Sequence, residues 1–297
     1  DCPFESAERT IVESRMLAHT GSFTYKSVSG SRRWKIITLT SNTYTMFQIS
    51  PLAFVHPNAK IGDNVTINAF AYIDDNVEIG EGCVIGPHVS IRSGARIGKN
   101  NRFYDGCVIS AAPQDFRWKG EDSFVEIGDN NCIREHVIIN RSIHAGKSTR
   151  IGNNSFIMAQ SHIGHDSIVG DYVVIGNAAK IAGACKNGNY TILSSNALVH
   201  ENCDIAEWVL IKGGCRVNNN VPPFTIMAHN PIEYYGVNAY ILRKGKKSEA
   251  TIDDIAKCYR HIYQSQTSPF NALKRIETDV DPSTERDEIL KLSLIHI

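Results

Sequence analysis

Apolar residues recur at every sixth position along most of this chain. The series runs without a polar member from Ile49 to Ile109, resumes at Ile127 and ends at Val217, and only Ala145 and Asn187 weaken its second part. Its other members are Val55, Ile61, Ile67, Ile73, Ile79, Ile85, Ile91, Ile97, Phe103, Ile133, Ile139, Ile151, Ile157, Ile163, Val169, Ile175, Ile181, Leu193, Val199, Ile205 and Ile211. Small residues follow four positions after many of them, so both sets are predicted to face one core.

A short fixed period predicts a solenoid, because no single unit can bury its apolar side without its neighbours. Glycine often follows the apolar residue, as at Gly62, Gly80 and Gly164, where corners between flat faces favour a residue without a Cβ. The pattern resembles the hexapeptide-repeat proteins, in which three hexapeptides form a coil of about 18 residues. That resemblance, and not the period itself, implies a left-handed parallel β-helix.

The period is interrupted once between residues 109 and 127, by the segment from Ala111 to Glu121. A segment that leaves and rejoins the same phase is predicted to be a loop projecting from the solenoid. Loops of this kind often form binding sites in repeat proteins.

Beyond Pro222-Pro223 the spacing becomes helical, with an apolar face from Ile252 to Tyr263 and Ser248 as its N-cap. Ser268-Pro269 and Asp281-Pro282 are predicted to begin two more helices. We therefore expect an N-terminal extension over residues 1–45, a β-helix over 46–228 and a helical domain over 229–297, whose last residues suggest a truncated end.

The composition excludes several functions. Lys plus Arg and Asp plus Glu number 31 each, so there is no net field for nucleic acid or an anionic membrane. Without a long apolar segment or a signal pattern, no membrane insertion is expected and the predicted location is cytoplasmic. The cysteines form no CxxC pair, and five of them, Cys83, Cys107, Cys185, Cys203 and Cys215, fall at an inward phase as small core residues.

The candidate chemistry lies in the segment Ser161-His162-Ile163-Gly164-His165-Asp166. His165 should point out of the solenoid as a general base, with Asp166 fixing its tautomer. In stacked coils Gly183 would lie next to His165 as an oxyanion donor, and Glu201 would follow one coil later. His144 and Lys147 would extend this stripe in the preceding coil. The alternative remains open that these are ordinary surface residues, and that His162 pairs with Asp115 or is merely solvated.

Several further motifs resemble one family, the UDP-N-acetylglucosamine 3-O-acyltransferases that begin lipid A synthesis. The resemblance covers about residues 46 to 277 and rests on Phe54-Val55-His56-Pro57, Gln114-Asp115 before Gly120-Glu121, Ile127-Gly128-Asp129, Ile133-Arg134-Glu135, His162 to Asp166, Ala182-Gly183, Val199-His200, Val221-Pro222-Pro223 and Tyr235-Gly236-Val237-Asn238.

The resemblance implies that His165 removes the proton of the glucosamine 3-hydroxyl, which attacks the thioester of a 3-hydroxyacyl group on acyl carrier protein. It implies that Asp166 orients His165 and that the Gly183 N–H stabilises the oxyanion. Neither a cofactor nor a metal is expected, and the enzyme would be a homotrimer with its sites between subunits. The substrate-binding residues would be Gln114, Asp115, His162, His200, Glu201 and Asn238, with Gly213 bounding the acyl chain.

Four positions depart from the family pattern. Ala184 and Asn140 replace histidines, Glu201 replaces a glutamine and Tyr240 replaces an acid. The catalytic base is unaffected, whereas the nucleotide contacts and acyl preference are open. The glycine and apolar signals also fade from Lys186 to Asn189, which leaves the regularity of the coil there open.

Three alternatives remain at this stage. The N-acyltransferase of the same pathway shares the solenoid but carries a large N-terminal nucleotide-binding domain. A hexapeptide carbonic anhydrase would need a third histidine for zinc beside His162 and His165. A non-catalytic scaffold would tolerate loss of His165.

Overall fold

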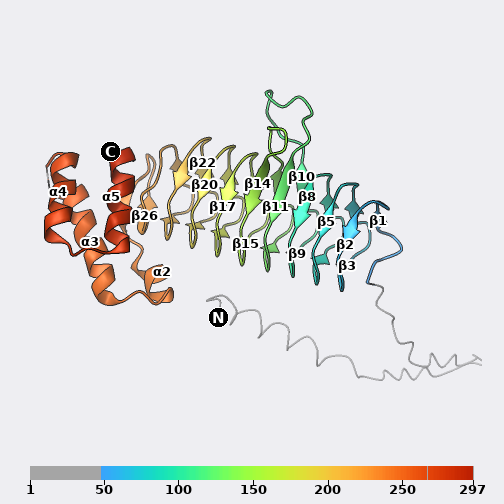
Figure 1. Cartoon of the computed structure of the whole chain (residues 1–297), viewed down its shortest axis with the longest axis horizontal. Coiled ribbons are helices and arrows are strands. Elements are labelled where there is room, and N and C mark those ends of the chain that lie inside the picture. The colour runs from blue at the N-terminus through green and yellow to red at the C-terminus, as the bar shows by residue number, and fades with distance from the viewer. Residues whose placement is uncertain (1–47, 266, 297) are drawn as a thin grey trace, which may run out of the picture. The chain divides into compact units, whose positions relative to one another are not determined.

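The computed structural model describes residues 48–265 and 267–296 (Figure 1). The predicted extension over residues 1–45 therefore lies outside the described residues. The division of the remainder at residue 228 stays a prediction.

Three parallel sheets form the β-helix, and each coil contributes one short strand to each sheet. The first sheet holds β1 (Phe54–Val55), β4 (Tyr72–Ile73), β7 (Ser90–Ile91), β10 (Val108–Ala111), β13 (Ile138–Asn140), β16 (His162–Ile163), β19 (Lys180–Ile181), β22 (Leu198–Val199) and β25 (Arg216–Val217). The second holds β2 (Lys60–Ile61), β5 (Glu78–Ile79), β8 (Ala95–Ile97), β11 (Phe124–Ile127), β14 (Ser148–Ile151), β17 (Ile168–Val169), β20 (Lys186–Asn187) and β23 (Asp204–Ile205). The third holds β3 (Thr66–Ile67), β6 (Val84–Ile85), β9 (Arg102–Phe103), β12 (Cys132–Ile133), β15 (Phe156–Ile157), β18 (Val174–Ile175), β21 (Ile192–Leu193), β24 (Leu210–Ile211), β26 (Thr225–Ala228) and β27 (Glu233–Val237), where β27 pairs antiparallel with β26.

The apolar series forms the core, as predicted. Ile73 pairs with Ile91 and Ile163 with Ile181, so equivalent side chains of successive coils stack in columns. From Ile67 to Val217 the apolar members of the series are buried, with the exception of Ala145, and so are the five cysteines predicted to face inward. The described cysteines are free thiols.

The glycines that follow the apolar residues serve close stacking and not a left-handed backbone. A Cβ on Gly80 would lie 2.6 Å from the carbonyl oxygen of Gly98 in the next coil. The left-handed corner comes two residues later and is often asparagine, as at Asn64, Asn100 and Asn154. Asparagine tolerates positive φ better than most residues, which explains its place there.

Two coils are longer than the others. Ile109 pairs with Ile139, and the extra residues form the predicted loop between β10 and β11, which projects from the solenoid in Figure 1. Ile139 pairs with Ile163 and not with Ile157, the member of the series one regular coil later, because residues 141–147 form a second detour. The predicted alignment of His144 and Lys147 with the column of His165 is therefore wrong, since Ala145 matches the phase of the period but occupies no strand.

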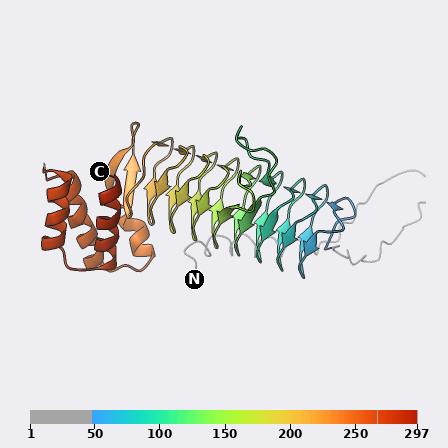
Figure 2. The same cartoon turned by 45° about the horizontal axis from the view of Figure 1, so that its top comes forward.

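Four helices close the C-terminal end of the solenoid: α2 (Ala239–Lys244), α3 (Glu249–Tyr263), α4 (Pro269–Asp279) and α5 (Thr284–His296) (Figure 2). Ser248 and Ser268 cap α3 and α4 as predicted. The last helix begins at Thr284 and not at Asp281-Pro282, because the Ser283 hydroxyl accepts from the Arg286 amide at 3.1 Å.

Side chains from the last coils join the helices in one core. Trp208 and Phe224 from the solenoid pack with Leu242, Ile255 and other residues of the helices. Among the described helices, none is both long and apolar enough to cross a membrane.

Candidate active site

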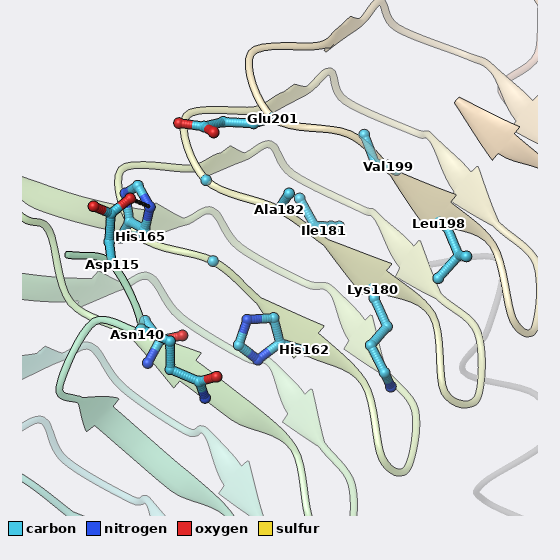
Figure 3. Close-up of a pocket in the computed structure, with 13 residues that line it drawn as sticks. Asp115, Asn140, His162, His165, Lys180, Ile181, Ala182, Leu198, Val199 and Glu201 are labelled. Atoms are coloured by element: carbon cyan, nitrogen blue, oxygen red, sulfur yellow. Dashed lines mark ion pairs between the residues drawn. The ribbon is translucent and has the colours of Figure 1, made fainter. Parts of the chain in front are cut away.

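His165 follows β16 at a corner of the prism, and its side chain lies outside the apolar core. The residue is nevertheless only 8% exposed, because the loop between β10 and β11 covers it. Figure 3 shows Asp115 of that loop beside the His165 ring, with Glu201 close by. The predicted outward direction is correct, and the low exposure follows from the loop.

Asp166 fixes one side of the imidazole. Its carboxylate lies 2.8 Å from His165 Nδ1, and it also accepts hydrogen bonds from the Ser142 hydroxyl and from the Ile143 amide at 3.2 Å. Burial raises the pKa of the Asp166 carboxyl, but these hydrogen bonds together outweigh burial and hold its pKa below the usual range. An ionised Asp166 accepts a hydrogen bond from the Nδ1–H group. The unprotonated Nε2 then faces the pocket.

The support for Asp166 comes from the second detour. Ser142 and Ile143 belong to residues 141–147, which the six-residue period did not identify as an insertion. The Asp166 amide donates to Thr149 Oγ1 at 2.8 Å, which holds the left-handed corner in place. The detour therefore positions the acid that orients His165.

Gly183 lies directly against the His165 ring from the next coil. A Cβ at this position would be 2.3 Å from His165 Cε1 and 2.4 Å from Nε2. Within the described residues, the Gly183 amide donates to no protein acceptor, while its neighbours Ala182 and Ala184 both donate to other coils. An N–H without an internal acceptor beside an imidazole is suited to an oxyanion.

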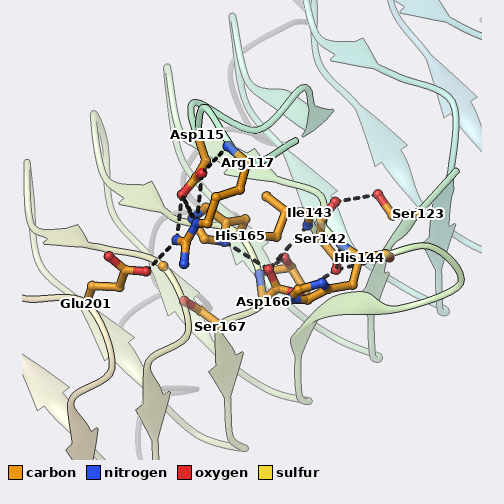
Figure 4. A network of polar contacts seen from close by, with 12 residues as sticks. Asp115, Arg117, Ser123, Ser142, Ile143, His144, His165, Asp166, Ser167 and Glu201 are labelled. Carbon is orange, nitrogen blue, oxygen red and sulfur yellow. Dashed lines mark hydrogen bonds and ion pairs between the residues drawn. The ribbon is translucent and has the colours of Figure 1, made fainter. Parts of the chain in front are cut away.

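The projecting loop contributes a charged network above His165 (Figure 4). Asp115 Oδ2 lies 3.2 Å from His165 Nε2, and Arg117 Nη2 lies 2.6 Å from both Asp115 Oδ2 and Glu201 Oε1. Hydrogen bonds from the Arg117 side chain and amide hold the pKa of the Asp115 carboxyl well below its usual range. Asp115 therefore remains ionised at neutral pH, and Arg117 is the counter-ion that it shares with Glu201.

A cavity of about 370 Å³ opens beside these groups. Its lining includes six of the predicted site residues, namely Gln114, Asp115, His162, His165, Gly183 and Glu201. Burial, followed by the charges of Lys180 and His165, lowers the pKa of His162, which favours a neutral imidazole there. The open alternative that His162 pairs with Asp115 is not what the structure contains, since Asp115 contacts His165 and Arg117.

Of the other four predicted site residues, Asp166 supports His165 from outside this cavity, and three lie away from both. His200 Nε2 contacts Arg216 Nη2 at 3.1 Å, and Gly213 lies beside Ser195. Asn238 is buried and donates to the Trp208 carbonyl at 2.9 Å. Within one chain these residues are not brought to His165.

The prediction missed Arg117, Lys180 and Ser142. The sequence contained a sign of the Arg117–Asp115 contact, because an arginine two residues after an acid in a projecting loop can form an ion pair with that acid. From the sequence, Asn140 was noted only as a departure from the family pattern. In the structure its side-chain Nδ2 donates to the Ala112 carbonyl at 2.7 Å and supports the base of the loop.

One group of side chains has the spacing of a metal site. Ligand atoms of Asp115, His165 and Glu201 lie within 4.8 Å of one another. The Arg117 guanidinium bridges the two carboxylates of this group and supplies the positive charge. The set differs from the three-histidine zinc site considered above, because two of its members are acids.

Comparison with known proteins places this chain in a class. The bacterial transferase hexapeptide model matches residues 58–93, 76–111 and 148–183, and the model described as domain 2 of UDP-N-acetylglucosamine O-acyltransferase matches residues 220–293. The chain is thus a hexapeptide-repeat transferase, with the left-handed parallel β-helix and C-terminal helices of that class.

The relatives identify the family within that class. An acyl-[acyl-carrier-protein]–UDP-N-acetylglucosamine O-acyltransferase from Pseudomonas putida is 35% identical over 245 residues, which are 82% of this chain and 94% of that protein. This chain belongs to the family of acyl-[acyl-carrier-protein]–UDP-N-acetylglucosamine O-acyltransferases.

Solved structures agree with this assignment. The UDP-N-acetylglucosamine acyltransferase of Bacteroides fragilis is 43% identical with a TM-score of 0.80, covering 82% of this chain and 96% of that one. The homologous structure from Acinetobacter baumannii is 31% identical with a TM-score of 0.79, covering 84% of this chain and 97% of that one.

Proposed function

We propose that this protein transfers a 3-hydroxyacyl group from acyl carrier protein to the 3-hydroxyl of UDP-N-acetylglucosamine, the first step of lipid A synthesis. The observation that carries the proposal is the His165 imidazole, oriented by Asp166 at 2.8 Å and placed against Gly183 at the edge of the cavity. The names of the relatives supply the substrates.

The geometry suits direct acyl transfer. Nε2 of neutral His165 removes the hydroxyl proton as the sugar oxygen attacks the thioester carbon. The negative charge that develops on the carbonyl oxygen is stabilised by the Gly183 N–H. When the intermediate collapses, the carbon–sulfur bond breaks and the protonated His165 returns its proton to the thiolate.

The remaining predicted residues divide into three groups. Gln114, Asp115, His162 and Glu201 line the cavity beside His165, which supports a role for them in binding the sugar nucleotide. His200 and Gly213 lie away from it, and in the proposed homotrimer they would complete the site of a neighbouring subunit. Asn238 is 1% exposed and its side chain donates to the Trp208 carbonyl, so its role is to support the fold. Light scattering that shows a monomer at working concentration would contradict the trimeric arrangement.

Three further elements of the proposal come from the sequence. The protein is cytoplasmic, it needs neither metal nor cofactor, and its chain divides into residues 1–45, 46–228 and 229–297. Enzyme assays with and without a chelator test the second point.

The decisive experiment is transfer from 3-hydroxyacyl-acyl carrier protein to UDP-N-acetylglucosamine by the unchanged chain and by His165→Ala. We expect kcat to fall by about 100-fold or more in the variant, because a positioned general base contributes a factor of that order. His136→Ala, at an exposed histidine that does not line the cavity, is the matched control and should retain activity. Full activity in His165→Ala would favour a non-catalytic role for this column, and no transfer by the unchanged chain would exclude the proposed substrates.

A further inference from the structure

Asp115 occupies the position that a substrate hydroxyl needs. Its Oδ2 lies 3.2 Å from His165 Nε2, while Asp166 lies 2.8 Å from Nδ1. A neutral imidazole has one N–H, so it can donate to only one of these carboxylates. The arrangement therefore differs from that of a base ready to accept a proton, because the Nε2 side is already occupied by an anion.

Arg117 and Glu201 hold Asp115 in this position. The Arg117 guanidinium binds Asp115 through Nε, at 3.0 and 3.1 Å, and through Nη2 at 2.6 Å. The same Nη2 donates to Glu201 Oε1 at 2.6 Å. Glu201 stands on a coil after β22, so this ion pair fastens the loop to the solenoid (Figure 4).

The tip of the loop has few other attachments. In the part of the chain that the structure describes, the hydrogen bonds and ion pairs between residues 113–121 and the coils all involve Asp115 or Arg117. Trp118 adds a contact with Arg141, whose guanidinium lies 5.3 Å from the ring centroid. Phe116 is 99% exposed and contributes no packing. The position of Asp115 therefore depends on the Arg117–Glu201 pair.

We propose that Arg117 and Glu201 are positioning residues, whose ion pair keeps Asp115 over His165 until the sugar nucleotide displaces it. The inference rests on the proposed function and adds to it a closed and an open position of the loop. If only the open form admits the sugar hydroxyl, the apparent affinity is reduced by the fraction of open protein. Weakening the pair should then lower the KM for UDP-N-acetylglucosamine by a larger factor than it changes kcat.

Glu201→Gln tests this with opposite signs for the two roles of Glu201. The substitution preserves size and removes the charge, so a positioning role predicts a KM about two- to fivefold lower, the range expected for a partly exposed ion pair. A direct sugar contact predicts a higher KM. Glu78→Gln, which removes the comparable ion pair with Lys60 at 2.8 Å, is the matched control and should change neither KM nor kcat.

A second measurement does not depend on catalysis. Tryptic cleavage after Lys119, followed by mass spectrometry without substrate, should be faster in Glu201→Gln than in the unchanged chain or in Glu78→Gln. Equal cleavage rates, or a KM that stays the same or rises, would overturn the inference. If no variant transfers acyl groups, the proposed function fails, and the cleavage rates alone still decide whether Glu201 holds the loop.

Discussion

His165 depends on two neighbours that act on different sides of its ring. Asp166 fixes Nδ1, and Gly183 leaves room for the ring where any other residue would place a Cβ within 2.4 Å of it. Asp166 in turn depends on Ser142 and Ile143, which satisfy its remaining oxygen positions. The imidazole is therefore fixed by the Asp166 carboxylate on one side and fits into the space beside Gly183 on the other.

Gly183→Ala should reduce kcat by about 100-fold while the protein remains folded. The Gly183 backbone is not left-handed, so alanine is tolerated locally, but the new methyl group must push the His165 ring aside. A displacement of about 1 Å at a reacting group can cost a factor of that order. Steady-state kinetics and circular dichroism measure the two effects separately.

Gly188→Ala is the control for inserting a methyl group between coils. Its Cβ would lie 2.7 Å from the Glu207 amide, away from His165, so it should lower stability and leave kcat close to the original value. Equal losses of kcat in both variants would mean that coil spacing, and not the ring position, controls activity.

Only part of this site could be predicted from the sequence. His165, Asp166 and Gly183 were identified because stacking in register makes equivalent positions of successive coils adjacent. Arg117 was missed, since its contact with Glu201, 84 residues later, depends on how an irregular loop folds back. No period extends through such a loop.

At the scale of elements, the period predicted strands well and insertions unevenly. The loop between β10 and β11 was evident because its residues break the apolar phase. The detour over residues 141–147 was hidden, because Ala145 is small enough to pass as a weak member of the series. At Lys186–Asn187 the weak signal left the regularity of the coil open, and β20 pairs regularly with β17 and β23.

Asn187→Val should stabilise the solenoid. Asn187 takes an apolar position between Val169 and Ile205, is 2% exposed, and neither of its side-chain polar atoms has a hydrogen-bond partner among the described residues. Removing buried polar groups without partners should raise the free energy of unfolding by about 1–3 kcal/mol. Urea denaturation measures the change.

Asn131→Val should have the opposite effect. Asn131 is equally buried, but its side-chain Nδ2 donates to the Gly152 carbonyl at 2.9 Å, and its Oδ1 accepts from the Ser155 backbone amide at 2.8 Å. Its loss should therefore cost about 1–3 kcal/mol. A gain of stability in both variants, or in neither, would mean that hydrogen bonding does not decide the fate of buried asparagines here.

For the whole molecule, the important feature is how the helices attach to the solenoid. The side-chain Nδ2 of Asn238 donates to the Trp208 carbonyl, and the Tyr259 hydroxyl donates to the Pro223 carbonyl. The Lys247 ammonium binds Glu285 at 2.6 Å, which ties α5 to the turn after α2. Caps and apolar spacing predicted where helices α3 and α4 begin, but these contacts between distant segments have no local signature.

The same junction should make stability depend on pH. Burial, and then the charges of Glu207 and Glu285, raise the pKa of Glu288 in α5 to about 7. Below about pH 4.5 the carboxyl is protonated in both folded and unfolded chains, so folding is not penalised. As the pH rises from there through 7, the unfolded chain ionises freely, whereas the folded chain must ionise a half-buried group. About 1–2 kcal/mol of stability should be lost over this range after allowance for solvent screening.

Thermal unfolding at pH 5 and pH 8 can isolate this contribution. Glu288→Gln should reduce the fall in Tm between the two pH values, because glutamine cannot ionise. Glu277→Gln, at an exposed position of α4, should leave that fall unchanged. The explanation fails if Glu288→Gln retains the full pH dependence, since other groups would then account for it. If Glu288→Gln reduces the pH dependence, the half-buried Glu288 links the docking of α5 to the protonation state of the protein near neutral pH.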